Sequence, residues 1–218
     1  MSNTDSFIDE VTEEVRRDRL FRLFRRYGWI ALVVVLAVVG GAAWNEYSKA
    51  RDRAEAQATG DALRAALGAA DPAARAEALA GIAVADGAAA ALADFLRADN
   101  LIAAGEDPAA AELLAAIAAR QDVPPVYRSL AELKSAILSA GTMAPAERLA
   151  VLDRLAQPGA PFRAIALEQK ALAHLEAGER DAAVAALRAI LDSPQATPGL
   201  RQRATQMMVT LGEDPRAT

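Results

Sequence analysis

Few side chains in this sequence could take part in chemistry, and they do not form a recognisable catalytic set. The chain has one histidine, His174, and no cysteine, which excludes cysteine nucleophiles, thiolate metal sites and disulfides. A general acid or base needs a partner within hydrogen-bond reach. Neither Glu168 nor Glu176 stands three or four residues from His174, the spacing that brings side chains together on a helix. We therefore expect His174 to be a packing or surface residue.

The acidic pairs and the glycines have ordinary structural explanations. Glu106 and Asp107 fall at a turn, and Glu213 and Asp214 lie near the end of the chain, where acidic residues commonly cap helices. The glycines recur at the spacing of turns and match no phosphate-binding fingerprint, and a single histidine cannot build a multi-histidine metal site. We predict that the protein is not an enzyme and has no catalytic residue, cofactor, metal ion or small-molecule substrate.

The elements that must carry these residues are helices. Alanine accounts for 56 of the 218 residues, and aromatic residues for 5%. A composition rich in alanine, leucine, arginine and acidic residues favours helices over strands. The net charge of −5 disfavours a general nucleic-acid-binding protein, which needs a basic face to neutralise phosphates. We predict an all-α fold with no nucleic-acid partner.

One segment differs sharply from the rest of the chain, because no charged residue occurs from Tyr27 to Asn45. At a rise of about 1.5 Å per residue, a helix over residues 27–47 is roughly 31 Å long, the thickness of the hydrocarbon core of a bilayer. Tyrosine and tryptophan lie at both ends, where they favour the membrane interfaces. We predict a transmembrane helix over 27–47 that contacts lipid, rather than a buried core helix.

Basic residues near the ends of this segment predict its orientation, since the richer side favours the cytoplasm. They are Arg16, Arg17, Arg19, Arg22, Arg25 and Arg26 before it, and Lys49, Arg51 and Arg53 after it. We predict a single-pass membrane protein with a cytoplasmic N-terminus and residues 48–218 translocated, which in a bacterium means the periplasm. The alternative is a signal peptide cleaved after Ala43, because small residues precede that position.

Residues 1–26 form a leader with six acidic and six basic side chains. Phe7, Ile8, Val11 and Val15 recur at helical spacing, which predicts an amphipathic helix. Acidic residues occupy the first half and arginines the second, so the charges complement the helix dipole and set the arginines beside anionic lipid headgroups. We expect the leader either to orient the span or to dock a cytosolic partner.

Residues 48–218 contain an internal repeat of 36 or 37 residues. Three series keep this period: Gly68, Gly105, Gly141 and Gly178; Pro72, Pro108, Pro145 and Ala182; and Pro125, Pro161 and Pro198. We expect the glycines to end helices in left-handed turns. We expect Asp71, Asp107 and Asp181 to be N-caps of the helices that follow, two of which have proline next. A period near 36 is the length of a helix-turn-helix unit.

The repeat predicts four helix pairs, each with a first helix A and a second helix B, and one C-terminal capping helix. The pairs are 51–67 with 72–85, 88–104 with 108–120, 126–140 with 145–156, and 162–177 with 182–192, and the capping helix is 200–211. Because one pair cannot bury its apolar face alone, we expect the pairs to stack into a solenoid with a continuous core. The expected core residues are Ala98, Leu101, Ala110, Leu114, Ile117, Ala171, Leu175, Ala183, Leu187 and Ile190.

The fourth pair resembles a tetratricopeptide repeat, with Gly178 as its mid-turn glycine. The residues that fall where the motif has small, small and large side chains are Ala171, Ala183 and Leu187. Lys170 and His174 depart from the motif, which prefers larger apolar or aromatic groups there. The other pairs are more degenerate, and the period exceeds the usual length of about 34 residues, so we expect longer or irregular turns.

The order of segments narrows the resemblance. An acidic-to-basic leader from Glu10 to Leu20 is followed by Arg26-Tyr27-Gly28, one span and about four repeat units. Over nearly its whole length the chain is similar to the ancillary SecYEG translocon subunit family of proteobacteria. The resemblance implies an inner-membrane protein associated with the SecYEG translocon and with a membrane-anchored periplasmic chaperone of the prolyl-isomerase type. It implies no catalytic residues.

We therefore predict a membrane-anchored module for protein–protein interaction. Stacked helix pairs curve, so the A helices are expected to line a concave surface that holds an extended segment or a partner helix. The resemblance implies an ancillary subunit of the Sec translocon that acts with periplasmic chaperones on newly translocated proteins. The alternative is a structural scaffold of another cell-envelope or cell-division assembly. No individual partner-binding residue is predicted.

Overall fold

The computed structural model describes residues 3–84 and 87–215, with side chains described for residues 25–30, 32–84 and 87–215. Every regular element in these ranges is an α-helix, so the predicted all-α class is confirmed. The chain divides into two compact units, residues 1–58 and residues 59–218.

The first unit consists of helix α1, Asn3–Leu67, whose last turns belong to the second unit. Its part from Arg25 to Leu67 is long and apolar enough to cross a membrane, with a mean hydropathy of 2.0 in its most apolar window and none of that window buried. A membrane anchor and a signal sequence share these properties. The rings of Trp44 and Tyr47 lie 6.3 Å apart. The leader side chains named above, from Phe7 to Val15, lie outside the described residues.

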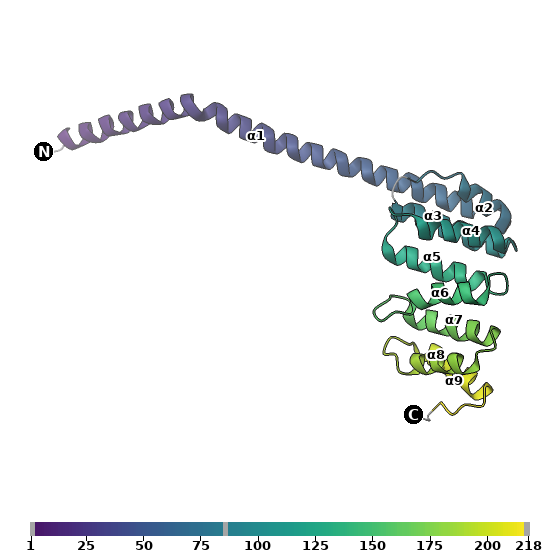
Figure 1. Cartoon of the computed structure of the whole chain (residues 1–218). Coiled ribbons are helices and arrows are strands. Elements are labelled where there is room, and N and C mark those ends of the chain that lie inside the picture. The colour runs from purple at the N-terminus through teal and green to yellow at the C-terminus, as the bar shows by residue number, and fades with distance from the viewer. Residues whose placement is uncertain (1–2, 85–86, 216–218) are drawn as a thin grey trace. The chain divides into compact units, whose positions relative to one another are not determined.

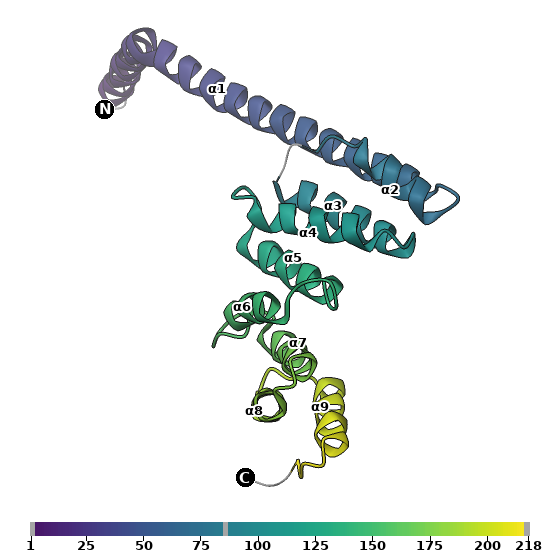
Figure 2. The ribbon, with the colours of Figure 1, turned by 45° about the vertical axis from the view of Figure 1, so that its right-hand side comes forward.

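The second unit is a stack of helices, each packed against the next in chain order (Figures 1 and 2). They are α2 Pro72–Ala80, α3 Gly87–Ala103, α4 Asp107–Ala119, α5 Pro125–Leu138, α6 Pro145–Leu155, α7 Arg163–Glu176, α8 Arg180–Leu191 and α9 Pro198–Thr210. From α3 onward both ends of every helix lie within two residues of the predicted positions. The stacked pairs and the final single helix confirm the predicted solenoid.

Glycine turns close three of the helices in the same way. Gly105 has a φ of 80° and donates to the carbonyl of Ile102 at 3.0 Å, while the next amide, Glu106 N–H, donates back to Leu101 at 2.9 Å. This pair of bonds is the Schellman motif, which satisfies the last carbonyls of a helix. The same two bonds recur at Gly178 and Gly212. The left-handed turns predicted at 105, 141 and 178 are therefore confirmed.

The turn after α1 differs from this prediction. Gly68 does not have a positive φ; its N–H donates to Ala65 and the N–H of Ala69 donates to Ala66. These i→i+3 bonds continue the right-handed winding past Leu67. The chain therefore reverses between α1 and α2 without a left-handed residue.

The predicted start of the first A helix at residue 51 is wrong, because α1 is continuous from Asn3 to Leu67. The predicted end of α2 and two predicted N-caps are also wrong. Helix α2 ends at Ala80 rather than Ala85, because Gly81 caps it: the Gly81 N–H donates to the carbonyl of Ala78, and the N–H of Ile82 donates to the carbonyl of Leu79. Asp107 and Asp181 are not N-caps: each lies in the first turn of its helix, and neither preceding cap residue makes a side-chain capping bond. The reason is that the Schellman turns are short. Helix α4 therefore begins at Asp107 itself and α8 begins at Arg180, so neither aspartate precedes its helix.

The prediction for Asp71 is confirmed, because its carboxylate accepts a hydrogen bond from the N–H of Ala74 at 2.8 Å. This is the standard N-cap bond to the third residue of the helix. Pro72 follows at the first helical position, where the N–H that proline lacks would have no partner within the helix.

The core runs along the whole stack as overlapping clusters, each shared by three neighbouring helices. Nine of the ten predicted core residues are buried, and Leu175 is half-buried against the α7–α8–α9 cluster. Small side chains such as Ala98 and Ala171, both with 0% exposure, let the helices approach closely, and leucine and isoleucine fill the spaces between them. Among consecutive pairs from α2 to α9, α5 and α6 make the sparsest contact.

Candidate functional site

His174 lies in the last turn of α7, and its partner comes from the adjacent turn. Its Nδ1 is 2.7 Å from Oε2 of Glu179, and its side chain is 13% exposed. Glu179 is five residues away, so a helix could not bring the two together. The Schellman turn at Gly178 does so by reversing the chain. The helical spacing rule did not predict this pair. His174 is therefore a surface residue held by one carboxylate.

The acidic pairs have structural roles at the turns. Glu106 is the residue after the left-handed Gly105, and Asp107 begins α4. Glu213 accepts from Arg180 at 2.8 Å and from Arg188 at 3.3 Å, which ties the end of α9 to α8. Within residues 3–84 and 87–215, no group of three or more His, Cys, Asp or Glu side chains could hold a metal ion.

An apolar surface lies on the A helices, and we call it the helix-A face. It consists of Leu92, Leu96 and Asp99 on α3, Tyr127, Leu130, Lys134 and Ile137 on α5, and Ile165, Gln169 and Leu172 on α7. On each helix these residues recur three or four positions apart, so they share one side. None of them is buried. The exposed fractions are 56% for Leu92, 39% for Tyr127, 40% for Ile137 and 41% for Ile165.

Direct contacts join the parts of this face. The Tyr127 ring meets the buried Phe95 ring edge-on, with centroids 6.5 Å apart. Lys134 on α5 forms an ion pair with Asp99 on α3, and its Nζ lies 5.9 Å from the centre of the Phe95 ring. Helices α5 and α7 share the core cluster that includes Leu133. The face is therefore a surface built by three successive A helices.

A second ion pair, between the A helix α7 and the capping helix α9, repeats the first with the acid again on the earlier helix. Arg203 on α9 binds the carboxylate of Glu168 on α7 through two bonds, Nε to Oε1 at 2.6 Å and Nη2 to Oε2 at 3.0 Å. This hydrogen bonding raises the pKa of Arg203 above its ordinary value. In both pairs, Asp99 with Lys134 and Glu168 with Arg203, the partners stand 35 residues apart, close to one repeat period. Acid–base pairs thus join α3 to α5 and α7 to α9 at a spacing close to one repeat period.

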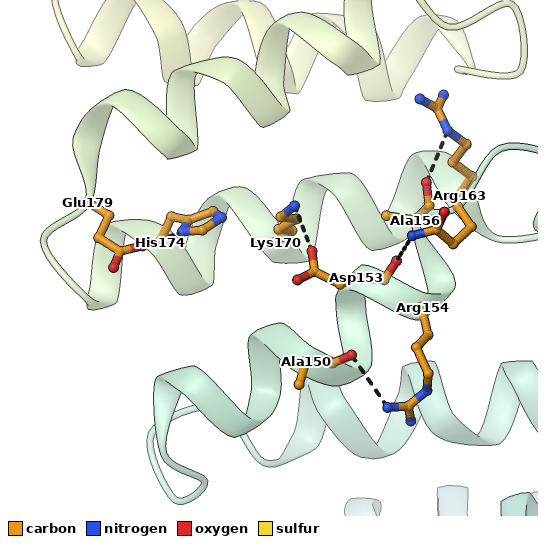
Figure 3. Close-up of polar contacts among 9 residues, drawn as sticks. Ala150, Asp153, Arg154, Ala156, Arg163, Lys170, His174 and Glu179 are labelled. Atoms are coloured by element: carbon orange, nitrogen blue, oxygen red, sulfur yellow. Dashed lines mark hydrogen bonds and ion pairs between the residues drawn. The ribbon is translucent and has the colours of Figure 1, made fainter.

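Helices α6 and α7 are joined by polar contacts across the repeat boundary (Figure 3). Lys170 Nζ lies 2.6 Å from Asp153 Oδ1, and Arg163 Nε donates to the carbonyl of Ala156 at 3.1 Å. By contrast, a pocket of about 300 Å³ lies between α4, α5 and α6, lined by four alanines together with Glu132, Ser135, Met143, Val151 and Arg154. Helix α6 is therefore held more firmly by the next repeat than by the helix before it.

Comparison with known families identifies the repeat. Residues 22–210 match the model of the Tetratricopeptide repeat-like domain. The chain belongs to this family. Comparison with curated proteins gave no match, and comparison with solved structures gave none. Tetratricopeptide-like repeat domains are typically non-catalytic modules that bind other proteins.

Both departures from the tetratricopeptide pattern are stabilised locally. Lys170, 28% exposed, pairs with Asp153, and His174 pairs with Glu179. The motif positions in the fourth repeat are packed as a tetratricopeptide-like repeat requires, since Ala171, Ala183 and Leu187 all have 0% exposure. The polar residues therefore replace apolar motif positions without leaving a buried charge unpaired.

The sequence did contain a signal for the helix-A face. A second apolar stripe runs along α5 at Tyr127, Leu130 and Ile137, separate from the buried Leu133 and Ala136. A tetratricopeptide-like A helix that carries apolar residues on a side its own repeat does not bury offers them to a ligand. Sequence reasoning named no core residue on α5 and did not recognise the exposed stripe.

Proposed function

We propose that this protein is a membrane-anchored, non-catalytic module that binds other proteins through the helix-A face. The observation that carries the proposal is the exposure of Leu92, Tyr127, Ile137 and Ile165 in a tetratricopeptide repeat-like domain. Soluble surfaces seldom leave several large apolar side chains together in water unless they bind a partner. Helix α1, which ends in the repeat unit, includes the segment apolar enough to cross a membrane.

We infer three parts for the chain: a cytoplasmic leader, residues 1–26; a transmembrane helix, residues 27–47; and a periplasmic repeat domain, residues 48–218. The six arginines before the span, against three basic residues after it, support this orientation. The aromatic residues Trp44 and Tyr47 support a membrane interface at the end of the span. The bilayer is then the partner of residues 27–47.

Within this role we propose an ancillary subunit of the SecYEG translocon that works with a membrane-anchored periplasmic chaperone of the prolyl-isomerase type. The support is the resemblance in the order of leader, span and repeats. Tethering also raises the local concentration of the repeat domain around chains that emerge at the membrane. Newly translocated proteins would be the clients.

Site-specific photo-crosslinking in native bacterial membranes tests the partners. We would place the photoreactive residue at Tyr127 or Ile137 on the helix-A face, with Val209 on α9, which is 61% exposed, as the control position. Adducts to SecYEG subunits or the chaperone from the face, and not from Val209, are expected. Adducts only to division or outer-envelope proteins would favour the scaffold alternative and reject the Sec assignment. Equal labelling from all three positions would reject the face as the binding site.

Fractionation tests the anchor separately. The full-length chain is expected in the inner-membrane pellet after washing at alkaline pH, because a single apolar span resists extraction. The mature N-terminus should begin within the leader. A soluble periplasmic chain that starts after Ala43 would show that the apolar segment is a signal peptide.

A further inference from the structure

We propose that the helix-A face selects apolar, uncharged polypeptide segments in an extended conformation, and that its charged residues do not contact the ligand as free charges. The inference rests on the proposed function and adds the chemistry of the partner. It follows from which residues on the face are left without a partner in the chain.

Apart from Gln169, the side chains on the face that form no ion pair are apolar. Leu92, Tyr127, Ile137 and Ile165 expose between 39% and 56% of their surface, and Leu96, Leu130 and Leu172 are half-exposed between them. Each offers area that a ligand can remove from water, worth about 25 cal/mol for every Å² of apolar surface. The Tyr127 ring is held edge-on against Phe95, so little conformational freedom is lost when a ligand packs on it.

The charges on the face are already neutralised. Among its residues only Asp99 and Lys134 are ionised, and they pair with each other. Lys134 also lies over the Phe95 ring, which holds the ammonium group in place. A charged ligand would have to compete with these contacts and would find no net charge to attract it. The face therefore lacks the free lysine or arginine that recognition of a carboxylate requires.

Three acidic residues beside the face are paired as well. Glu168, on the α9 side of the α7 residues, binds Arg203 through two bonds. On α5, Glu132 lies 3.6 Å from Arg154 of α6, and on α3, Asp94 binds Arg120, the residue that caps α4, at 3.0 Å. Every one of these pairs joins two different helices. Their role in holding the stack together leaves the apolar residues as the recognition surface.

The spread of the apolar residues fixes the shape of the ligand. Helices that pack together lie about 8–10 Å apart, so a ligand that contacts Leu92 on α3 and Ile165 on α7 must reach across roughly 20 Å. An extended chain rises about 3.3 Å per residue, which makes this distance about six residues. Alternate side chains of such a segment point the same way, so three apolar side chains could pack on the three helices.

Two matched peptides test the proposal on the full-length protein in lipid nanodiscs. The first is a fluorescent peptide of alternating serine with leucine or phenylalanine, and the second has glutamate and lysine in place of the apolar residues. Binding is measured by anisotropy, with the signal of empty nanodiscs subtracted. We expect the apolar peptide to bind and the charged peptide not to bind. Raising the salt concentration should change the apolar affinity by less than about twofold, because no ion pair with the ligand is screened.

Surface variants locate the binding. Leu92→Ser combined with Ile137→Ser should weaken binding of the apolar peptide by about tenfold or more, since the two variants together remove the apolar area of two contacts. Val209→Ser removes a side chain of at least equal exposure from α9 and should leave the affinity unchanged. Circular dichroism of each variant checks that the helices are intact.

Three results would overturn the inference. Tighter binding of the charged peptide, or a steep loss of affinity with salt, would show that charge recognises the partner. An equal loss of affinity from Val209→Ser would show that the apolar peptide binds elsewhere. If neither peptide binds while crosslinking from Tyr127 still captures a partner, the proposed ligand chemistry is wrong and the proposed interaction function stands. Failure of both experiments would reject both.

Discussion

Arg148 on α6 and Glu176 at the end of α7 form an ion pair in which the guanidinium is buried and the carboxylate is not. The Arg148 side chain is 2% exposed and that of Glu176 is 42% exposed. Nη1 lies 2.7 Å from Oε2, and Nη2 donates to Oε1 at 3.1 Å, while Nε has no hydrogen-bond partner among the described residues. Arg148 is thus a buried charge that depends on one partly exposed neighbour.

Substitution of Glu176 should lower the free energy of unfolding more than substitution of Arg148. Glu176→Gln leaves the guanidinium buried without a counter-charge, and we expect it to lower the free energy of unfolding by about 2 kcal/mol, below the cost for a fully buried pair because Glu176 is partly exposed. Arg148→Met fills similar space with apolar atoms and leaves Glu176 free to be hydrated, so we expect a change under about 1 kcal/mol. Urea unfolding measures both. A larger loss from Arg148→Met would contradict this explanation.

The left-handed turn at Gly178 should tolerate no side chain without cost. Its φ of 77° places a Cβ against the following carbonyl, so we expect Gly178→Ala to cost about 1–2 kcal/mol. Gly60 lies inside α1, and a Cβ added there would meet no atom within 4 Å. Gly60→Ala should therefore stabilise the protein by about 0.5–1 kcal/mol, because alanine favours the helix. Thermal unfolding of both variants should give shifts of opposite sign.

The aspartates that precede or begin the B helices should differ in importance. Asp71→Ala removes a capping hydrogen bond to Ala74 and should cost about 1 kcal/mol. Asp107 makes no capping bond and only complements the dipole of α4, so Asp107→Ala should cost no more than about 0.5 kcal/mol. Urea midpoints compare the two variants directly. Equal losses of stability in the two variants would mean that the negative charge near the helix end matters more than the capping hydrogen bond.

Asp122 should contribute to stability at neutral pH and lose that contribution in acid. A hydrogen bond from Arg120, at 2.8 Å, lowers the pKa of Asp122 below its ordinary value. A carboxyl group whose pKa is lower in the folded state stabilises the fold above its unfolded pKa, and the contribution disappears as the pH falls through the folded value. Carboxyl NMR titration should show the lowered pKa in the native protein and a normal one in Arg120→Gln. An unchanged titration in the variant would contradict the assigned cause.

The sequence predicted most of the fold because each repeat carries local signals at a fixed period. Pro108 and Pro145 mark helix starts, and Gly105 and Gly178 mark helix ends, so the helices from α3 onward lie close to their predicted bounds. The errors arose where local rules compete. Gly81 could end α2 as readily as a residue further on, and the turn at Gly68 continues with right-handed i→i+3 bonds where a left-handed glycine was predicted.

The candidate site could not be predicted in the same way, because its contacts join residues a whole repeat apart. Asp99 and Lys134 are 35 residues apart, and their pairing depends on how α3 packs on α5. The spacing rules for helices apply within one element and give no register between two elements. The exposed stripe of Tyr127 and Ile137 was present in the sequence, but only the packing of Leu133 and Ala136 shows which stripe remains uncovered.

The sparse contact between α5 and α6 has a consequence for how the repeat domain loses its structure. In a linear array each helix is coupled only to helices close to it in chain order, so the weakest coupling sets where cooperativity breaks. Helices α2–α5 and α6–α9 should therefore melt as two blocks, and native-state hydrogen exchange would group their amides accordingly. Local melting of α6–α9 would leave Leu92 and Tyr127 in place on an intact block. If a bound client pulled on the chain, α5 and α6 would separate first, and the helices within each block would stay folded.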